Sequence, residues 1–324
     1  MAGGRPDDLA AVTLAHLLDR HPDVDPGRID DVFLGNANGA GEENRDVARM
    51  AVLLAGWPTS VPGTTVNRLC GSGLEAAIQA ARAIETGDAS LVVAGGVESM
   101  SRAPWVLPKP DRAFPHDSAT AYSTSLGWRM VNPRMPAEWT VPLGEGAELL
   151  ADKYGITREA QDTFALASHE KAAAAWAAGR FDDEVVPWKL LAEVLPQGRK
   201  APAPLTWDES IREGGTLETM AGLRPAFRPD GTVTAGNASP LNDGASAVLL
   251  ADEATAAKLQ PLARIVSRAV HAVEPQYFGI GPVEAAREAL RKASIGWDDL
   301  TLVELNEGYA AQSLSCLAEW PELD

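Results

Sequence analysis

Cys70 stands in a stretch whose residue types suit nucleophilic chemistry. Residues 67–77 read NRLCGSGLEAA and join a run rich in β-branched residues to a helix-like pattern. A cysteine at a helix start meets unsatisfied N–H groups and the positive end of the helix dipole, which stabilise a thiolate. Gly71 and Gly73 carry no side chain, so a carbonyl substrate could approach the sulfur. The alternative is a buried structural thiol whose glycines serve helix–strand packing, and the local pattern does not decide between them.

The other thiol and the histidines favour structural roles. Cys316 lies in AAQSLSCLAEW, on a predicted helix, and is expected to be a small core residue. No histidine lies in a glycine-flanked turn beside a nucleophile, and only His116, in a long loop, is kept as a candidate. The rest are expected to be structural or exposed: His16, His21, His169 and His271. The spacings predict no metal site.

Two segments rich in small or polar residues are candidates for ligand binding. Residues 230–246, DGTVTAGNASPLNDGAS, would suit a narrow ligand channel, with a plain cluster of turns as the alternative. Residues 303–312, VELNEGYAAQ, end a predicted strand on Asn306 and Glu307. Polar residues at the ends of strands often line the crevice of an α/β sheet, although Asn306 could instead cap the last helix.

These residues need a framework, and the first third of the chain predicts a layered α/β domain. A helical pattern over 73–87 alternates with strand-like runs over 30–36, 63–69 and 90–96. Such alternation favours a largely parallel sheet.

The rest of the chain combines an insertion with a second α/β stretch. Residues 104–242 read as an insertion with helices over 144–155 and 157–179, the second capped by Thr157 and ended by Gly179. Strands are predicted over 244–252, 263–273 and 300–306, and helices over 281–293 and 309–320.

Composition narrows the functional class. The chain has 324 residues, 45% of them hydrophobic, and a net charge of −17, which argues against nucleic-acid binding. Two thiols do not make a disulfide framework and fit a reducing cytosol. The start, MAGGRPDDLA, lacks the apolar core of a signal peptide, and no apolar run is long enough to cross a bilayer. We therefore expect a cytoplasmic protein without membrane contact.

Five motifs in one order resemble the thiolase family, the acyl-CoA acetyltransferases. They are LGNANGAGEENRDVARMAVLLAGWP, VNRLCGSGLEAA, VVAGGVESMSRAP, DGTVTAGNAS followed by LNDGA, and VELNEGYAAQ. The likeness covers nearly the whole chain and is strongest to bacterial degradative thiolases of the 3-oxoadipyl-CoA type, which act in fatty acid or aromatic degradation. It implies an αβαβα fold with an inserted loop domain. The implied first half spans 1–255, with the insertion over about 108–241, and the second half spans 260–324.

The resemblance also implies a ping-pong acyl transfer with CoA and acyl-CoA as substrates and no bound cofactor. Cys70 matches the nucleophile that carries the acyl group, and Asn306 matches the residue that holds a water in an oxyanion hole. Ser239 matches a pantetheine contact. The other positions implied to line the CoA site are Arg212, Thr219, Phe227 and Ala235. Arg212, Arg224 and Arg228 could supply positive charge for the ligand. Homodimers or homotetramers are implied.

Departures from the family pattern lead to a further expectation. The family continues with a Gly-His-Pro motif, whose His activates the cysteine, and with a second Cys near a Gly that acts as acid and base. The sequence shows neither motif. Its first residues resemble the segment that follows the first buried strand in the family. We therefore expect truncation at the C-terminus and at the N-terminus, an incomplete second half and impaired activity. NEGYA also has Gly308 and Tyr309 where the family has Ala and Phe.

Three hypotheses follow from these departures. In the first, the chain is an acyltransferase with some activity. In the second, it is a catalytically deficient CoA-binding protein, or one half of a split enzyme that a C-terminal fragment completes. In the third, it is the product of a truncated gene model. A neighbouring gene that encodes the Gly-His-Pro and Cys-Gly segments would favour the split enzyme.

Overall fold

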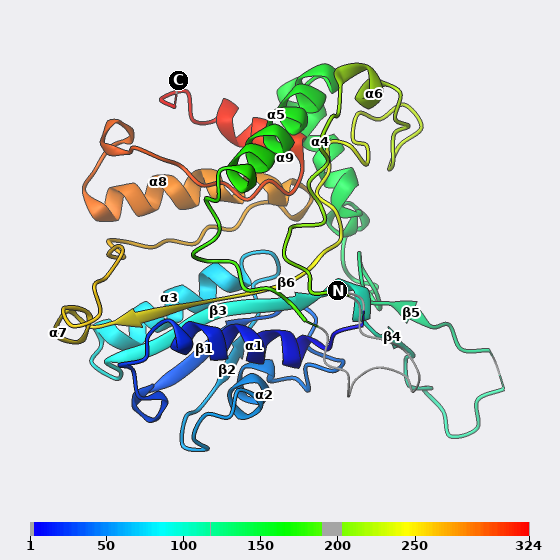
Figure 1. The fold of residues 1–324 in the computed structure, drawn as a ribbon. Coiled ribbons are helices and arrows are strands. Elements are labelled where there is room, and N and C mark those ends of the chain that lie inside the picture. The colour runs from blue at the N-terminus through cyan, green and yellow to red at the C-terminus, as the bar shows by residue number, and fades with distance from the viewer. Residues whose placement is uncertain (1–2, 117, 190–202, 324) are drawn as a thin grey trace. The chain divides into compact units, whose positions relative to one another are not determined.

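The computed structural model describes residues 3–116, 118–189 and 203–323. They form two compact units, each built from separate stretches of the chain (Figure 1). Unit 1 comprises Met1–Leu126, Val185–Asp208 and Leu241–Ile265. Unit 2 comprises Gly127–Glu184, Glu209–Pro240 and Val266–Asp324. These are units of packing, so the boundaries between halves implied by the resemblance stay a prediction.

A four-stranded sheet forms the centre of unit 1, in the order β2-β1-β3-β6. Its strands are β1 (Asp31–Gly35), β2 (Thr64–Val66), β3 (Leu91–Ser99) and β6 (Asp243–Ala251). β1 runs parallel to β2 and β3, whereas β6 runs antiparallel to β3, with Leu91 opposite Ala251. The strands predicted over 30–36, 63–69, 90–96 and 244–252 are confirmed, and the parallel part of the sheet carries an antiparallel edge strand.

Helices cover both faces of this sheet. α1 (Pro6–Asp19) and α2 (Val47–Leu54) pack on one face, and α3 (Ser72–Glu85) packs on the other (Figure 1). Successive residues of β3 alternate between these layers: Val93 joins the α1–α2 side, and Val92 joins the α3 side. The continuous apolar run of β3 is therefore buried on both faces, as its sequence predicts.

Shorter elements complete unit 1. β4 (Trp105–Val106) pairs antiparallel with β5 (Tyr122–Ser123). The remaining short helices of its described residues are α7 (Glu253–Ala256) and the 3-10 turns η1 (Pro26–Arg28) and η2 (Met100–Arg102).

The described residues of unit 2 form helices joined by extended segments. The helices are α4 (Leu143–Tyr154), α5 (Arg158–Ala177), α6 (Leu217–Ala221), α8 (Gly281–Ala293) and α9 (Ala310–Ala318). The 3-10 turns are η3 (Ala137–Thr140), η5 (Pro275–Ile280) and η6 (Trp297–Asp299). The predicted limits of α5 are confirmed: the Thr157 hydroxyl accepts a hydrogen bond of 3.1 Å from Ala160 N, and Gly179 follows with φ +67°.

The strands predicted over 263–273 and 300–306 are wrong. Within the described chain both segments run without ladder partners. Val266 and Leu302 are 61% and 80% exposed. Apolar β-branched residues favour extended backbone, but a strand also needs a neighbour that takes up its N–H and C=O groups.

The end of β1 lies directly against the first turn of α3. A Cβ atom on Gly35 would lie 2.3 Å from the carbonyl carbon of Ser72, which is too close for any side chain. Glycine at this position therefore sets how near the helix that follows Cys70 can approach the sheet.

We expect Gly35→Ala to lower the free energy of unfolding by about 1–3 kcal/mol, because the new methyl group must push α3 away from β1. The measurement is thermal or urea unfolding. Gly73→Ala is the matched control, since its Cβ would have as nearest neighbour Gly95 O at 3.9 Å. Equal losses in the two variants would contradict this account of the β1–α3 contact.

Candidate active site

Cys70 lies in the turn that leads from β2 to α3, as its sequence predicts, and its residue is exposed. Hydrogen bonds of the turn hold its backbone. Leu69 N donates to Asn67 Oδ1 at 2.8 Å, and Arg68 N donates to Ser72 Oγ at 2.8 Å. The Ser72 hydroxyl in turn donates to Leu69 O at 2.6 Å. Hydrogen bonds to the side chains of Asn67 and Ser72, one on each side of Cys70 in the sequence, thus fix the backbone of the turn that carries the thiol.

The turn contains one strained residue. Leu69 has φ +50°, in the left-handed region that residues other than glycine rarely adopt. Such strain costs about 1–3 kcal/mol and persists only where the surroundings enforce it. Here the Asn67 and Ser72 hydrogen bonds enforce it, and the residue they strain immediately precedes the thiol.

A buried carboxylate supports the turn from inside α3. Glu75 accepts hydrogen bonds from Arg68 Nε at 2.7 Å and from Gln79 Nε2 at 2.5 Å. The bond from Arg68 is the main reason that the pKa of Glu75 lies below its usual range. The ion pair joins the chain before the thiol to the helix after it, so it helps to fix their relative positions.

The glycines beside the thiol are not required by packing. An added Cβ would have its nearest neighbour at 3.5 Å for Gly71 and at 3.9 Å for Gly73, which are ordinary contacts. The close helix–strand approach uses Gly35 instead. Because Cys70 is also exposed, the alternative of a buried structural thiol is wrong.

Cys316 is the core residue that its sequence predicts. It is 0% exposed, and its Sγ lies 3.3 Å from Gly279 O and 3.6 Å from Gln312 Nε2. Burial raises the pKa of this thiol to about 11.

In unit 2 the structure brings the two ligand-binding candidate segments together. Ser239 N donates to Gly308 O at 3.1 Å, and Ala310 N donates to Asn237 O at 2.9 Å. An antiparallel bridge joins Ala238 to Tyr309 between them. Ser239 and the segment that carries Asn306 are therefore neighbours, although they lie far apart in the sequence.

Asn306 does not cap the last helix. The N-cap position of α9 is Tyr309, and the Asn306 residue is exposed. Its carbonyl accepts a hydrogen bond from Gly308 N at 3.1 Å. A Cβ on Gly308 would lie no closer than 3.6 Å to a neighbouring atom, so the alanine that is usual in the family would fit there.

The other positions implied to bind CoA surround the same segments. Arg212 donates from its guanidinium to Ala235 O at 2.9 Å. Phe227 packs edge-on against Tyr309, with ring centroids 6.4 Å apart. Thr219 lies in α6, where its hydroxyl donates to Thr216 O at 2.8 Å in a capping box. All of the positions implied to bind CoA or to hold the oxyanion water in unit 2 are exposed: Arg212, Thr219, Phe227, Ala235, Ser239 and Asn306.

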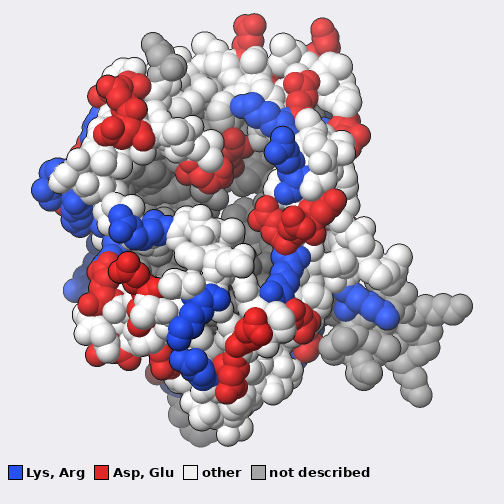
Figure 2. Space-filling model, turned by 60° about the vertical axis from the view of Figure 1, so that its left-hand side comes forward, with Lys and Arg blue, Asp and Glu red and all other residues white. Residues whose placement is uncertain are grey.

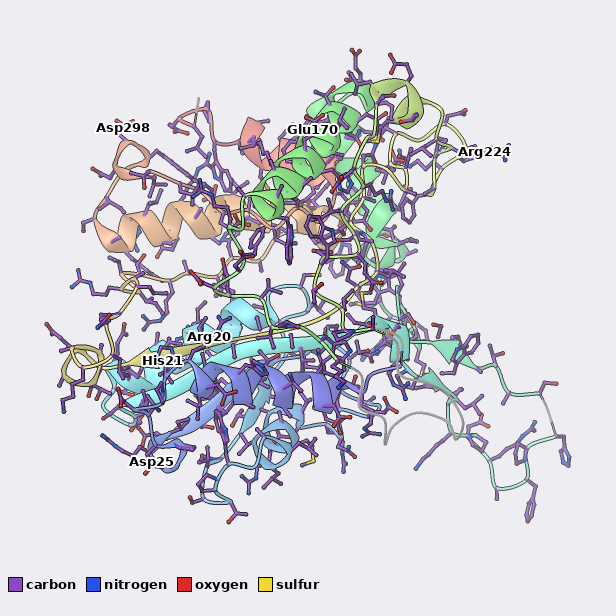
Figure 3. All side chains as sticks on the ribbon, viewed as in Figure 1. Arg20, His21, Asp25, Glu170, Arg224 and Asp298 are labelled. Atoms are coloured by element: carbon purple, nitrogen blue, oxygen red, sulfur yellow. The ribbon has the colours of Figure 1, made fainter. Side chains whose placement is uncertain are left out.

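Arg228 and Arg224, the other two arginines that could supply charge to a ligand, differ in their ion-pair partners and orientation. Arg228 forms ion pairs of 2.7 Å with both Glu145 and Asp152, which raise its pKa, so its charge is already compensated. The expectation that Arg228 offers charge to a ligand stays a prediction, and these ion pairs speak against it. Arg224 extends outward from the segment after α6 (Figure 3). On the face shown in Figure 2, basic and acidic side chains are interspersed.

Sequence reasoning missed the buried acids that hold the 230–240 segment. Glu148 is 1% exposed and accepts hydrogen bonds of 2.8–2.9 Å from Thr232 N, Thr232 Oγ1 and Val233 N. Asp162 is 2% exposed and accepts one of 2.8 Å from Asn237 Nδ2. The available signal was an acidic residue at core spacing on each of two predicted helices.

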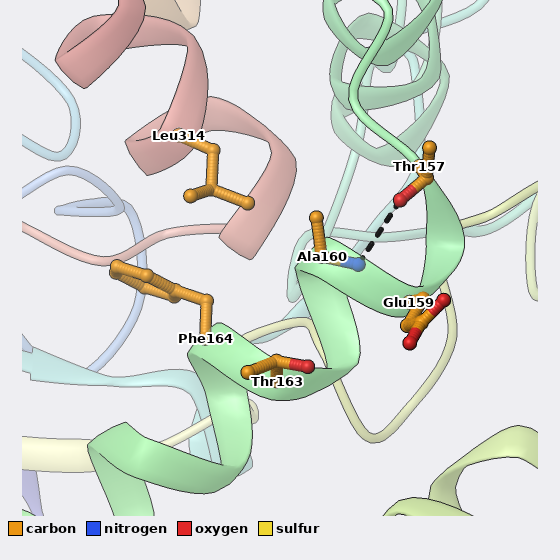
Figure 4. Close-up of a pocket in the computed structure, with 6 residues that line it drawn as sticks. All are labelled: Thr157, Glu159, Ala160, Thr163, Phe164 and Leu314. Atoms are coloured by element: carbon orange, nitrogen blue, oxygen red, sulfur yellow. Dashed lines mark hydrogen bonds between the residues drawn. The ribbon is translucent and has the colours of Figure 1, made fainter.

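An open hollow in unit 2 is lined by none of the candidate site residues. Its lining residues are Thr157, Glu159, Ala160, Thr163, Phe164 and Leu314 (Figure 4). The described residues contain no group of three or more His, Cys, Asp or Glu that could hold a metal ion. They also contain no helix long and apolar enough to cross a membrane.

Fold and site together define a layered α/β protein with an exposed cysteine at a strand–helix turn. Comparison with known proteins shows that the chain belongs to the thiolase family, a family of acyl-CoA acyltransferases. Residues 2–254 match the model of the thiolase N-terminal domain, and residues 259–321 match that of the thiolase C-terminal domain. Because both models match, the expectation of an incomplete second half finds no support.

Three relatives illustrate the match. A beta-ketoadipyl-CoA thiolase of Escherichia coli is 49% identical over 322 residues, which are 98% of this chain and 79% of the relative. The 3-oxoadipyl-CoA/3-oxo-5,6-dehydrosuberyl-CoA thiolase of E. coli K12 is 50% identical over 97% of this chain and 78% of the relative. The crystal structure of the Bacillus anthracis acetyl-CoA acetyltransferase superposes with a TM-score of 0.87 at 40% identity, over 99% of this chain and 78% of that chain. The expected α/β thiolase fold is thereby confirmed.

The two thiols should differ sharply in reactivity. We expect iodoacetamide to alkylate the folded protein at Cys70 and not at Cys316, because only Cys70 is exposed. With its pKa raised to about 11, Cys316 is almost entirely a protonated thiol at about pH 8, and the thiol form is a poor nucleophile. Peptide mass spectrometry at about pH 8, near the ordinary thiol pKa, locates the adduct. Alkylation of Cys316 at the same rate as Cys70 would contradict the structure.

Proposed function

We propose that this chain transfers acyl groups between CoA thioesters through an acyl-cysteine at Cys70. The observation that carries the proposal is an exposed thiol in a hydrogen-bonded turn at the start of α3, in a chain of the thiolase family. Gly71 and Gly73 carry no side chain, and an added Cβ on either would meet only ordinary contacts, which supports access of a thioester to the exposed thiol.

The reaction is thiolytic cleavage of a 3-ketoacyl-CoA. The Cys70 thiolate attacks the ketone carbon, and the adjacent carbon–carbon bond breaks. The electron pair leaves with the shorter CoA thioester, which takes up a proton. The thiol of free CoA then attacks the acyl-cysteine, releases the new acyl-CoA and returns the cysteine to its starting state. The reverse sequence is a Claisen condensation.

We assign CoA binding and oxyanion stabilisation to the linked segments of unit 2. Arg212 and Ala235 are joined by a hydrogen bond, and Ser239 lies beside the segment of Asn306. This arrangement supports a CoA site built from the positions implied by the resemblance, namely Arg212, Thr219, Phe227, Ala235 and Ser239. Asn306 holds the water that stabilises the oxyanion.

We further infer the substrate and the setting. Two of the relatives are named for 3-oxoadipyl-CoA or beta-ketoadipyl-CoA, so a 3-ketoacyl-CoA with a terminal carboxylate is the proposed substrate. CoA and acyl-CoA are substrates, and no bound cofactor is needed for the steps above. The thiols fit a reducing cytoplasm, and the resemblance favours a homodimer or homotetramer.

The second candidate function is a CoA-binding protein without turnover. It is the alternative that the departures from the family pattern leave open, such as Gly308 and Tyr309 in NEGYA. Both thiolase domain models match, however, and the comparisons give no support for the expected impairment. Turnover therefore has to be measured directly.

We expect an acyl adduct on Cys70 when the protein meets 3-oxoadipyl-CoA, and its removal with formation of acyl-CoA when CoA is added. Intact mass and peptide mass spectrometry detect the adduct, and loss of the 3-ketoacyl-CoA absorbance measures turnover. Cys70→Ser should abolish both. Acetoacetyl-CoA in parallel tests the preference for the carboxylate.

Cys316→Ala serves as the control. Because Cys316 is buried, this variant should still form the acyl adduct on Cys70. Retained CoA binding without adduct or turnover would sink the acyltransferase proposal and favour the CoA-binding protein.

A further inference from the structure

One face of α5 contacts each of the segments assigned to CoA. Residues 158, 161, 162 and 169 share this face because they recur at helical spacing. Their contacts are hydrogen bonds from Arg158 to Met220 O, from Gln161 to Thr232 Oγ1, from Asn237 to Asp162, and from Arg212 N to His169. α5 thus acts as a common support for segments that have few apolar residues of their own.

The last of these contacts joins α5 directly to a position implied to bind CoA. Arg212 N donates to Nδ1 of the half-buried His169 at 3.3 Å. The preceding residue, Ser168, donates from its hydroxyl to the carboxylate of Glu307, next to Asn306. Two consecutive residues of α5 therefore hold the Arg212 segment and the Asn306 segment.

We propose that His169 is a positioning residue for acyl-CoA, whose neutral imidazole holds the Arg212 segment in its binding conformation and releases it on protonation. The proposal rests on the proposed function of this site. Nothing in the resemblance points to His169, which the sequence predicts to be structural or exposed.

The chemistry of the contact requires one protonation state. A backbone N–H can donate to Nδ1 only when that nitrogen is unprotonated, so the proton of the neutral ring sits on Nε2. The imidazolium ion has donors on both nitrogens and would face the Arg212 N–H without an acceptor.

The surroundings of His169 favour the neutral ring. Burial lowers its pKa below the ordinary value of 6.5, and the nearby charge of Arg212 lowers it further. The carboxylate of Glu307, from the segment before α9, acts in the opposite direction. With a lowered pKa in the folded state, the contact is complete above about pH 6.5 and is lost as the pH falls through the pKa of the folded state.

The contact reaches the ligand through Arg212. Its guanidinium donates to Ala235 O at 2.9 Å, so the Arg212 segment and the 230–240 segment move together. Beyond Arg212, the capping box of Thr216 and Thr219 holds the start of α6. Loss of the His169 contact would free the chain before this box and weaken CoA binding without touching Cys70.

Amide hydrogen exchange on the full chain measures the contact between Arg212 and His169 directly, because the exchanging Arg212 N–H is the donor of that hydrogen bond. We expect His169→Leu to speed exchange in peptides that cover 209–216, and His169→Asn to leave it slow, since the Asn oxygen can take the place of Nδ1. Glu170→Gln is the matched control on the exposed neighbour (Figure 3). Peptides from α3 report any general loss of stability.

Calorimetric titration with CoA, on the Cys70→Ser background, tests the consequence. We expect His169→Leu to weaken binding by about fivefold at about pH 7.5, the effect of one lost hydrogen bond. The unsubstituted His169 protein should lose affinity between about pH 7.5 and pH 5.5, whereas His169→Asn should not.

The possible failures are distinguishable. Unchanged exchange over 209–216 in His169→Leu would overturn the role of His169, whatever happens to CoA. Equal pH dependence in the His169→Asn protein would overturn the protonation step. Absence of CoA binding in every protein, including the one with His169, would instead overturn the proposed function.

Discussion

The contact between the end of β1 and the first turn of α3 constrains everything around Cys70. Because Gly35 has no side chain, the helix backbone reaches the sheet at a distance that no other residue allows. Ser72, at the contact, also supplies the hydroxyl that holds the turn before it. The position of the thiol thus follows from backbone packing beneath it, and the strain at Leu69 is maintained by the same hydrogen bonds.

In unit 2 the segments proposed to bind CoA contain few apolar residues, so apolar packing alone does not hold them in place. Buried carboxylates do this instead. Glu148 binds the backbone of Thr232 and Val233, and Asp162 binds the side chain of Asn237. A buried polar group is stable only when its hydrogen bonds are satisfied, so each acid admits one conformation of the segment that it holds. That conformation places Ser239 beside Gly308.

Much of the framework could be predicted, because its signals are local. The limits of α5 follow from the Thr157 cap and Gly179, and the burial of β3 follows from an uninterrupted apolar run. The segments 263–273 and 300–306 carry the same kind of strand signal and form no strand. The difference lies in partners: a helix satisfies its own backbone groups, whereas a strand depends on neighbours that its own sequence does not contain.

By itself the sequence determined the motifs of the family, the thiol between strand and helix, and the caps of the helices. Each of these depends on residues only a few positions apart. Only the tertiary structure decided that Arg228 forms an ion pair with Glu145, 83 residues away in the sequence. The same holds for the hydrogen bond that His169 Nδ1 accepts from the backbone N–H of Arg212, 43 residues away. Charge and hydrogen-bond partners act over a few ångströms in space, so they are settled by packing and not by order along the chain.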